Sequence, residues 1–125
     1  GIGAAAGGIG YGIGKVLIQS KPNFASQEKL VQHFKAHGAE FGFKSESQYL
    51  KTAQGFLSGS KGQDVLQYTR SSGDLVRYNP KTNEFGVISK EGTIRTYFKP
   101  GEGMRYYERD RVRYSSRSSS GGRNR

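Results

Sequence analysis

The chain has 125 residues, of which 33% are apolar, and its 20 lysines and arginines outnumber 10 acidic residues to give a net charge of +10. That length fits one domain with tails, and a sequence pI near 10 favours a polyanionic partner: nucleic acid, an anionic membrane or an acidic protein. Because there is no cysteine, a disulfide scaffold, a zinc ribbon and thiol catalysis are all excluded.

The first segment, residues 1–21, is rich in glycine. It contains neither GxxxxGK[ST] nor GxGxxG, so a phosphate-cradling loop is excluded. Glycine is a poor helix former and the stretch is only weakly apolar, which disfavours a transmembrane helix. We interpret residues 1–21 as a linker or entry segment without stable membrane insertion. The initial glycine in place of methionine suggests a fragment of a longer protein.

Two helices are predicted next. Ser26 as N-cap and Gly38 as the left-handed C-terminal residue bracket a helix over Gln27–His37. Ser45 and Gln48 then form a capping box at the start of a second helix, whose apolar residues recur at helical spacing.

The pattern changes to short strands separated by the turn sequences SSGD, NPKTN and KEG. Helices followed by a meander predict an α+β fold, with N-terminal helices packed on a four-stranded, or slightly larger, antiparallel sheet. The folded domain is predicted to span residues 22–108, and residues 109–125 to be a disordered basic tail rich in Ser, Arg and Gly. The expected strands are 64–69, 75–78, 84–89 and 94–98.

The residues needed for several kinds of catalysis are missing. His33 and His37 have the i, i+4 spacing of a helical zinc pair, but the stretch HFKAH lacks the glutamate of HExxH and the acidic residues are scattered. No GxSxG elbow is present. We therefore expect no metal and no cofactor.

Metal-free RNA cleavage needs only what the chain retains. The 2′-hydroxyl of the substrate is the nucleophile, a histidine can transfer the proton, and Arg or Lys can stabilise the phosphorane. Along the last strand, simple alternation places Thr96 on one face and Arg95, Tyr97 and Lys99 on the other. The first face offers a hydroxyl donor and the second offers cations with a base-stacking ring, and alternation does not select between them.

Two blocks carry a family likeness: LVQHFKAHGAEFGFKSESQYLKTAQGFL and GDLVRYNPKTNEFGVISKEGTIRTYFKP. They resemble the C-terminal toxin modules of contact-dependent inhibition and related polymorphic toxin systems, within the ribonuclease superfamily that groups barnase, EndoU, colicin D and RelE. The resemblance implies helices against an antiparallel sheet and metal-independent RNA cleavage, often in a tRNA anticodon loop. It also implies an acidic immunity protein that covers the active site, and delivery by a larger secreted or cell-surface protein into the cytoplasm of a target cell.

The resemblance also ranks the site residues. The histidine of HGAEFG, the arginine of VRY and the threonine of IRTYF are the implied catalytic residues. Around them, cations and an aromatic ring are predicted to bind substrate. The resulting site is His37, Arg77 and Thr96 for catalysis, with Arg95, Tyr97, Lys99 and Lys81 for RNA binding.

Other interpretations remain open from the sequence. A non-catalytic basic RNA-binding module accounts for the charge equally well, and residues 1–18 raise the weaker idea of membrane damage. At single positions, His37 has the alternative of a helix-end residue whose positive form suits the local dipole. Arg77 has that of a cross-strand ion pair.

Overall fold

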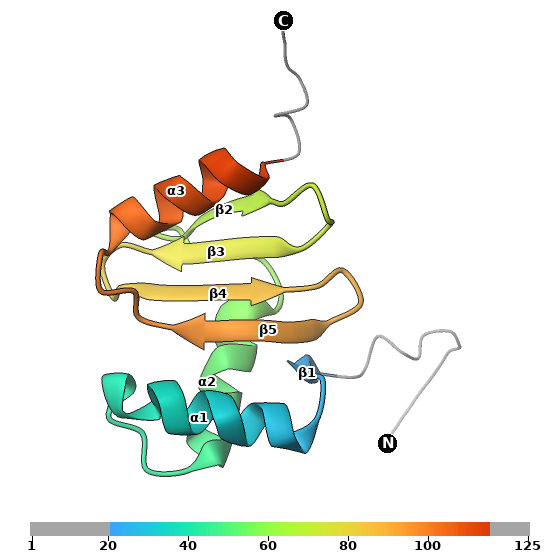
Figure 1. Ribbon diagram of the computed structural model, residues 1–125, viewed down its shortest axis with the longest axis vertical. Helices are drawn as coiled ribbons and strands as arrows, with labels where there is room; N and C mark the ends of the chain where they lie inside the picture. Colours follow the sequence, from blue (N-terminus) through green and yellow to red (C-terminus); the bar gives the residue numbers. More distant parts are fainter. Residues whose placement is uncertain (1–20, 116–125) are drawn as a thin grey trace, which may run out of the picture.

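A computed structural model describes residues 21–115, which form helices on both sides of one sheet (Figure 1). The Gly-rich linker predicted over residues 1–21 therefore lies almost wholly outside the described residues. In chain order the elements are β1 (Asn23–Phe24), α1 (Gln27–Phe41), α2 (Glu46–Leu57), β2 (Leu66–Thr69), β3 (Leu75–Asn79), β4 (Glu84–Ile88), β5 (Thr93–Phe98) and α3 (Met104–Tyr114).

The strands form a single sheet in the order β1-β5-β4-β3-β2. Strands β2 to β5 make the predicted antiparallel meander, and the α+β class is confirmed. The short β1 was not predicted; it pairs in parallel with β5 and makes the sheet five-stranded. Farther along β5, the Tyr49 hydroxyl donates to the Tyr97 carbonyl and the Lys99 N–H donates to Glu40, so side chains continue the pairing that β1 begins.

Helix α1 is one turn longer than the sequence suggested. It passes through Gly38 and ends at Phe41, because Gly42 adopts the left-handed conformation (φ 77°) and the Phe43 N–H bonds back to the Gly38 carbonyl. Gly38 has a packing role instead: a Cβ there would lie 2.6 Å from the Phe34 ring. The predicted N-caps of both helices are confirmed, since the Lys29 N–H donates to Ser26 Oγ and the Gln48 N–H donates to Ser45 Oγ.

A β-bulge in β5 changes the predicted facing of its side chains. Val87 pairs with Thr96 and Ile88 pairs with Ile94, so Arg95 is an extra residue between them. Beyond the bulge the alternation is displaced by one residue. Ile94 and Tyr97 therefore share one face, whereas simple alternation placed Ile94 with Thr96 and Tyr97 with Arg95.

The face that carries Ile94 and Tyr97 packs against α1 and α2. Its buried core is mainly aromatic and aliphatic, and the strand residue opposite α2 is Gly86, where a Cβ would lie 3.0 Å from Leu57. Close approach of the helix therefore requires the missing side chain. The core consists of Phe24, Leu30, Tyr49, Ala53, Leu57, Ile88, Ile94 and Tyr97.

The opposite face of the sheet packs against α3, a helix that the sequence did not predict and whose second half lies in the predicted tail. The expected tail boundary at residue 109 falls inside this helix, which continues to Tyr114. Its charged sequence offers little apolar periodicity, and only Tyr107 and Asp110 are buried. The second core is Val76, Tyr78, Phe85, Val87 and Tyr107. Within residues 21–115, no helix is both long and apolar enough to cross a membrane.

Candidate functional site

His37 lies on α1 with its ring held on two sides. Its Nδ1 is 3.2 Å from Glu40 Oε2, and its ring stacks on Phe98 with centroids 5.1 Å apart. Because a carboxylate only accepts, Nδ1 carries the hydrogen, and Nε2 of the neutral ring is left as an acceptor. The other oxygen, Glu40 Oε1, accepts from the Lys99 N–H at 3.0 Å. The imidazole is therefore oriented by a carboxylate that is itself fixed to the end of β5.

The His37 side chain is 26% exposed, so the ring is positioned without being sealed from solvent. One turn earlier on α1, the ring of His33 lies 6.1 Å from that of His37 and stacks on Phe24 at 5.0 Å. Burial lowers the pKa of His33, and the nearby charges of His37 and Lys29 lower it further. His33 is thus held as a neutral ring in a half-buried position.

Thr96 and Phe98 lie on the α3 side of β5, next to each other on that face because side chains two apart along a strand point the same way. Thr96 pairs across the sheet with Val87 and is half-buried. His37 meets Phe98 directly, and Thr96 is one same-face position farther along the strand. His37 therefore contacts Phe98, and Thr96 lies two residues before Phe98 on the same face of β5.

Arg77 does not fit the phosphate-binding role that the sequence suggested. The residue is only 4% exposed, and its guanidinium donates to Gln67 Oε1 and to the carbonyls of Phe56, Ser58 and Gly59. Burial lowers the pKa of the Arg77 guanidinium. Its N–H groups donate to acceptors within the protein. Arg77 is a structural residue that binds the C-terminal end of α2.

Tyr97 is also excluded from substrate contact, because the bulge turns it into the core under α1 and α2, where it is fully buried. Burial and the Glu84 carboxylate that accepts its hydroxyl raise the pKa of Tyr97 well above its ordinary range. Lys81 is exposed and pairs with Asp64 at 3.4 Å, in the β3–β4 turn. Lys99 remains beside His37 through its backbone bond to Glu40, with its Nζ 5.3 Å from the Phe41 ring centroid.

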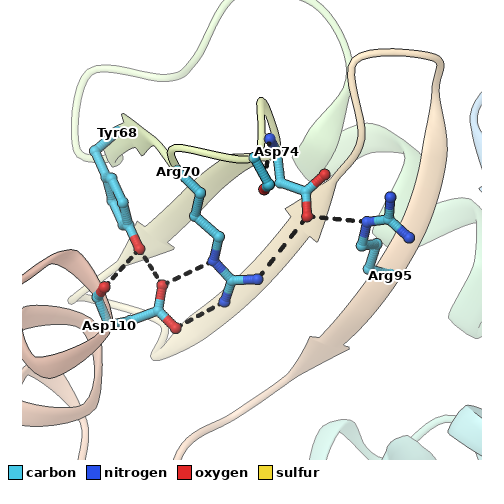
Figure 2. Close-up of polar contacts among 6 residues, drawn as sticks. Tyr68, Arg70, Asp74, Arg95 and Asp110 are labelled. Carbon is cyan, nitrogen blue, oxygen red and sulfur yellow. Dashed lines mark hydrogen bonds and ion pairs between the residues drawn. The ribbon is translucent and has the colours of Figure 1, made fainter. Parts of the chain in front are cut away.

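Arg95, the bulge residue, belongs to a polar network on the α3 side of the sheet (Figure 2). Its Nε lies 2.9 Å from Asp74 Oδ2, and the same carboxylate reaches Arg70 at 4.0 Å. Arg70 in turn makes a two-pronged contact with Asp110 of α3, which also accepts the hydroxyl of Tyr68. The network ties the β2–β3 hairpin and β5 to the last turns of α3.

In residues 21–115, no three His, Cys, Asp or Glu side chains converge as metal ligands would. The chemistry that the geometry offers at His37 is proton transfer by an oriented imidazole that is stacked on the Phe98 ring. The sequence predicted His37 as a catalytic residue without its partner Glu40, which spacing could have suggested because Glu40 is three residues later on the same helix.

No protein-family model matches this sequence, and no curated protein matches it. A solved structure described as a ribonuclease from Escherichia coli complexed with its inhibitor protein is 22% identical, over 63% of this chain and 95% of that chain, with a TM-score of 0.47. Because the identity and the TM-score are this low, the ribonuclease activity and the inhibitor are properties of that protein and are not assigned to this chain.

Proposed function

We propose that this chain is a metal-independent endoribonuclease in which His37 transfers protons. The observation that carries the proposal is the geometry of its ring. Glu40, fixed by the Lys99 N–H, holds Nδ1, while the half-exposed position leaves Nε2 to accept a proton. A carboxylate behind an imidazole also stabilises the imidazolium that proton transfer creates.

The reaction needs no protein nucleophile. The RNA 2′-hydroxyl oxygen attacks the adjacent phosphorus as Nε2 of His37 takes its proton, and the bond from phosphorus to the 5′-oxygen then breaks. The leaving oxygen takes up a proton from water, and the His37 imidazolium returns its proton to solvent, which gives a 2′,3′-cyclic phosphate and a free 5′-hydroxyl. In this proposal Thr96, two residues before Phe98 on the same strand, supplies the hydroxyl donor, and Lys99, whose backbone N–H binds Glu40, supplies the cation that stabilises the extra negative charge on the phosphorane.

Three further proposals rest on the family resemblance and on the net charge of +10. The substrate is a tRNA, cut in its anticodon region. An acidic immunity protein neutralises the enzyme by covering the site. The chain acts as a toxin in the cytoplasm of a target cell, delivered there as part of a larger secreted or surface protein.

The test is cleavage of total tRNA by purified protein in EDTA, comparing the wild type with His37→Ala and with His33→Gln as a matched control on the same helix. We expect His37→Ala to lower the cleavage rate by about 10²- to 10⁴-fold with the fold retained, and His33→Gln to keep most of the activity. Mapping the RNA ends should find 2′,3′-cyclic phosphates.

A non-catalytic RNA-binding module gives a different result in the same assay. It would bind tRNA with a strong salt dependence and leave it intact. Intact RNA of every kind offered, at protein concentrations that saturate binding, would rule out the nuclease proposal.

A further inference from the structure

One side of α3 is connected to the His37 site by a row of rings. The ring of Tyr106 meets Phe98 edge-on with centroids 5.4 Å apart, and Phe98 in turn stacks on His37 at 5.1 Å. Phe98 and Tyr106 are both half-buried, so each keeps part of its ring accessible. The row therefore runs from α1, past the end of β5, to α3, and Phe98 in its middle lies on the same face of the sheet as Thr96.

Two arginines extend this row along the helix. Arg109 and Arg113 follow Tyr106 at i+3 and i+7, the spacing that places residues on one side of an α-helix. The Arg109 guanidinium lies 5.9 Å from the Tyr106 ring centroid, and both arginines are exposed. We call Phe98, Tyr106, Arg109 and Arg113 the α3 flank.

The opposite side of the helix has a different environment. Arg111 pairs there with Glu108 and lines an open pocket beside β2, together with Lys61 and Leu66. It is therefore separated from His37 by the body of the helix. The same short helix thus carries cations on two sides, and the α3 flank is the one beside the proposed site.

The α3 flank is held on a fixed support. Asp110 is 8% exposed, receives two bonds from Arg70 and accepts the hydroxyl of Tyr68, as Figure 2 shows. The Arg70 guanidinium also lies 4.8 Å from the ring centroid of Tyr114. Because Asp110 fixes α3 through buried contacts, the helix backbone is already ordered before binding, which lowers the entropic cost of binding a ligand.

We infer that the α3 flank binds single-stranded RNA, namely the nucleotides next to the phosphate at His37; this inference rests on the proposed function. Two half-buried rings followed by two exposed arginines match the two parts of an RNA strand, since bases stack on aromatic faces and phosphates pair with guanidinium groups. An acidic protein would use the arginines alone, whereas an RNA strand would also use the exposed parts of Phe98 and Tyr106, whose remaining surface packs against Phe85.

The experiment measures binding of a fluorescent, uncleavable 2′-O-methyl RNA 12-mer by anisotropy over a series of salt concentrations. We expect Arg109→Gln/Arg113→Gln to weaken binding roughly tenfold near 100 mM salt, and to lower the slope of log K against log salt by about 1.4, for two lost phosphate contacts. The matched control Lys61→Gln/Arg111→Gln removes the same charge from the opposite side and should change the affinity by less than about threefold.

A second control is Glu102→Gln, which breaks the Glu102–Arg109 ion pair but keeps the arginine and should leave RNA binding intact. Equal weakening by the two double variants, or none by either, would overturn the inference, as would poly-glutamate displacing the RNA as effectively as unlabelled RNA of equal charge. The binding assay needs no cleavage, so binding by the α3 flank without any cutting of natural RNA would reject the nuclease proposal alone.

Discussion

At the scale of single residues, Glu40 joins two functions. One carboxylate oxygen accepts the backbone N–H of Lys99 and the other accepts Nδ1–H of His37. The side chain that closes the end of β5 is therefore the same one that sets the tautomer of the proposed catalytic ring.

Replacing Glu40 by Gln tests this link. An amide can still accept Nδ1–H, but it cannot stabilise an imidazolium by charge, so we expect kcat to fall by roughly ten- to a hundredfold with little change in KM. Single-turnover cleavage of tRNA in EDTA measures the effect. Glu28→Gln, an exposed change in the first turn of the same helix, is the matched control. A Glu40→Gln variant as active as this control would show that the carboxylate is dispensable.

At the scale of elements, the end of α2 depends on Arg77. The last carbonyls of a helix have no partner within it, and here one guanidinium from β3 binds the carbonyls of Phe56, Ser58 and Gly59. A strand side chain therefore acts as the C-terminal cap of a helix that precedes it in the chain.

We expect Arg77→Met to lower the free energy of unfolding by about 2–4 kcal/mol, because it removes the four part-buried hydrogen bonds of the guanidinium. Urea denaturation measures this loss. Under conditions where the variant stays folded, its rate of RNA cleavage should remain within about threefold of wild type, since a structural residue does not touch the phosphate. Normal stability with abolished cleavage would restore the phosphate-binding role.

At the scale of the whole molecule, the antiparallel order of β2 to β5 was predictable from the sequence. The face of the sheet on which each β5 side chain lies was not. Caps and turn residues act locally, so Ser26, Ser45 and the turn sequences gave the helices and the meander. The bulge at Arg95 depends on pairing with β4, and it reversed the facing of Tyr97. The burial of Arg77 likewise depends on α2 lying across the sheet, which no local pattern contains.

Helix α3 was missed for a related reason. Its sequence is highly charged, and what docks it is the contact of Asp110 with Arg70 and Tyr68, forty or more residues earlier in the chain. Periodicity of apolar residues cannot reveal a helix that is fixed by a buried ion pair. Of the tail predicted over residues 109–125, residues 109–114 belong to α3, and residues 116–125 lie outside the described part of the chain.

The stability of the whole molecule should decrease on mild acidification, in part through His33. Burial holds the pKa of His33 below its ordinary 6.5, so the unfolded chain binds a proton that the folded chain resists. The contribution of this ring to stability is complete above pH 6.5 and is lost as the pH falls through the folded-state pKa. Around it lie Lys29 and His37 on α1 and the ring of Phe24 on β1.

Urea denaturation at about pH 7.5 and about pH 5.5 compares wild type with His33→Gln. We expect the wild type to lose more stability between the two pH values than the variant, which has no titrating ring at this position. Equal losses would assign the acid sensitivity to other groups.

The docking of α3 has a consequence for survival in the presence of proteases. Trypsin-like enzymes cut after arginine in extended chains. If this stretch were a flexible tail, it would be an early target for them, because it contains Arg105, Arg109, Arg111 and Arg113. In α3 the same peptide bonds are helical, so they do not adopt the extended conformation that cleavage requires. The buried Asp110 thus allows a densely basic stretch to persist intact where an unfolded one would be trimmed away.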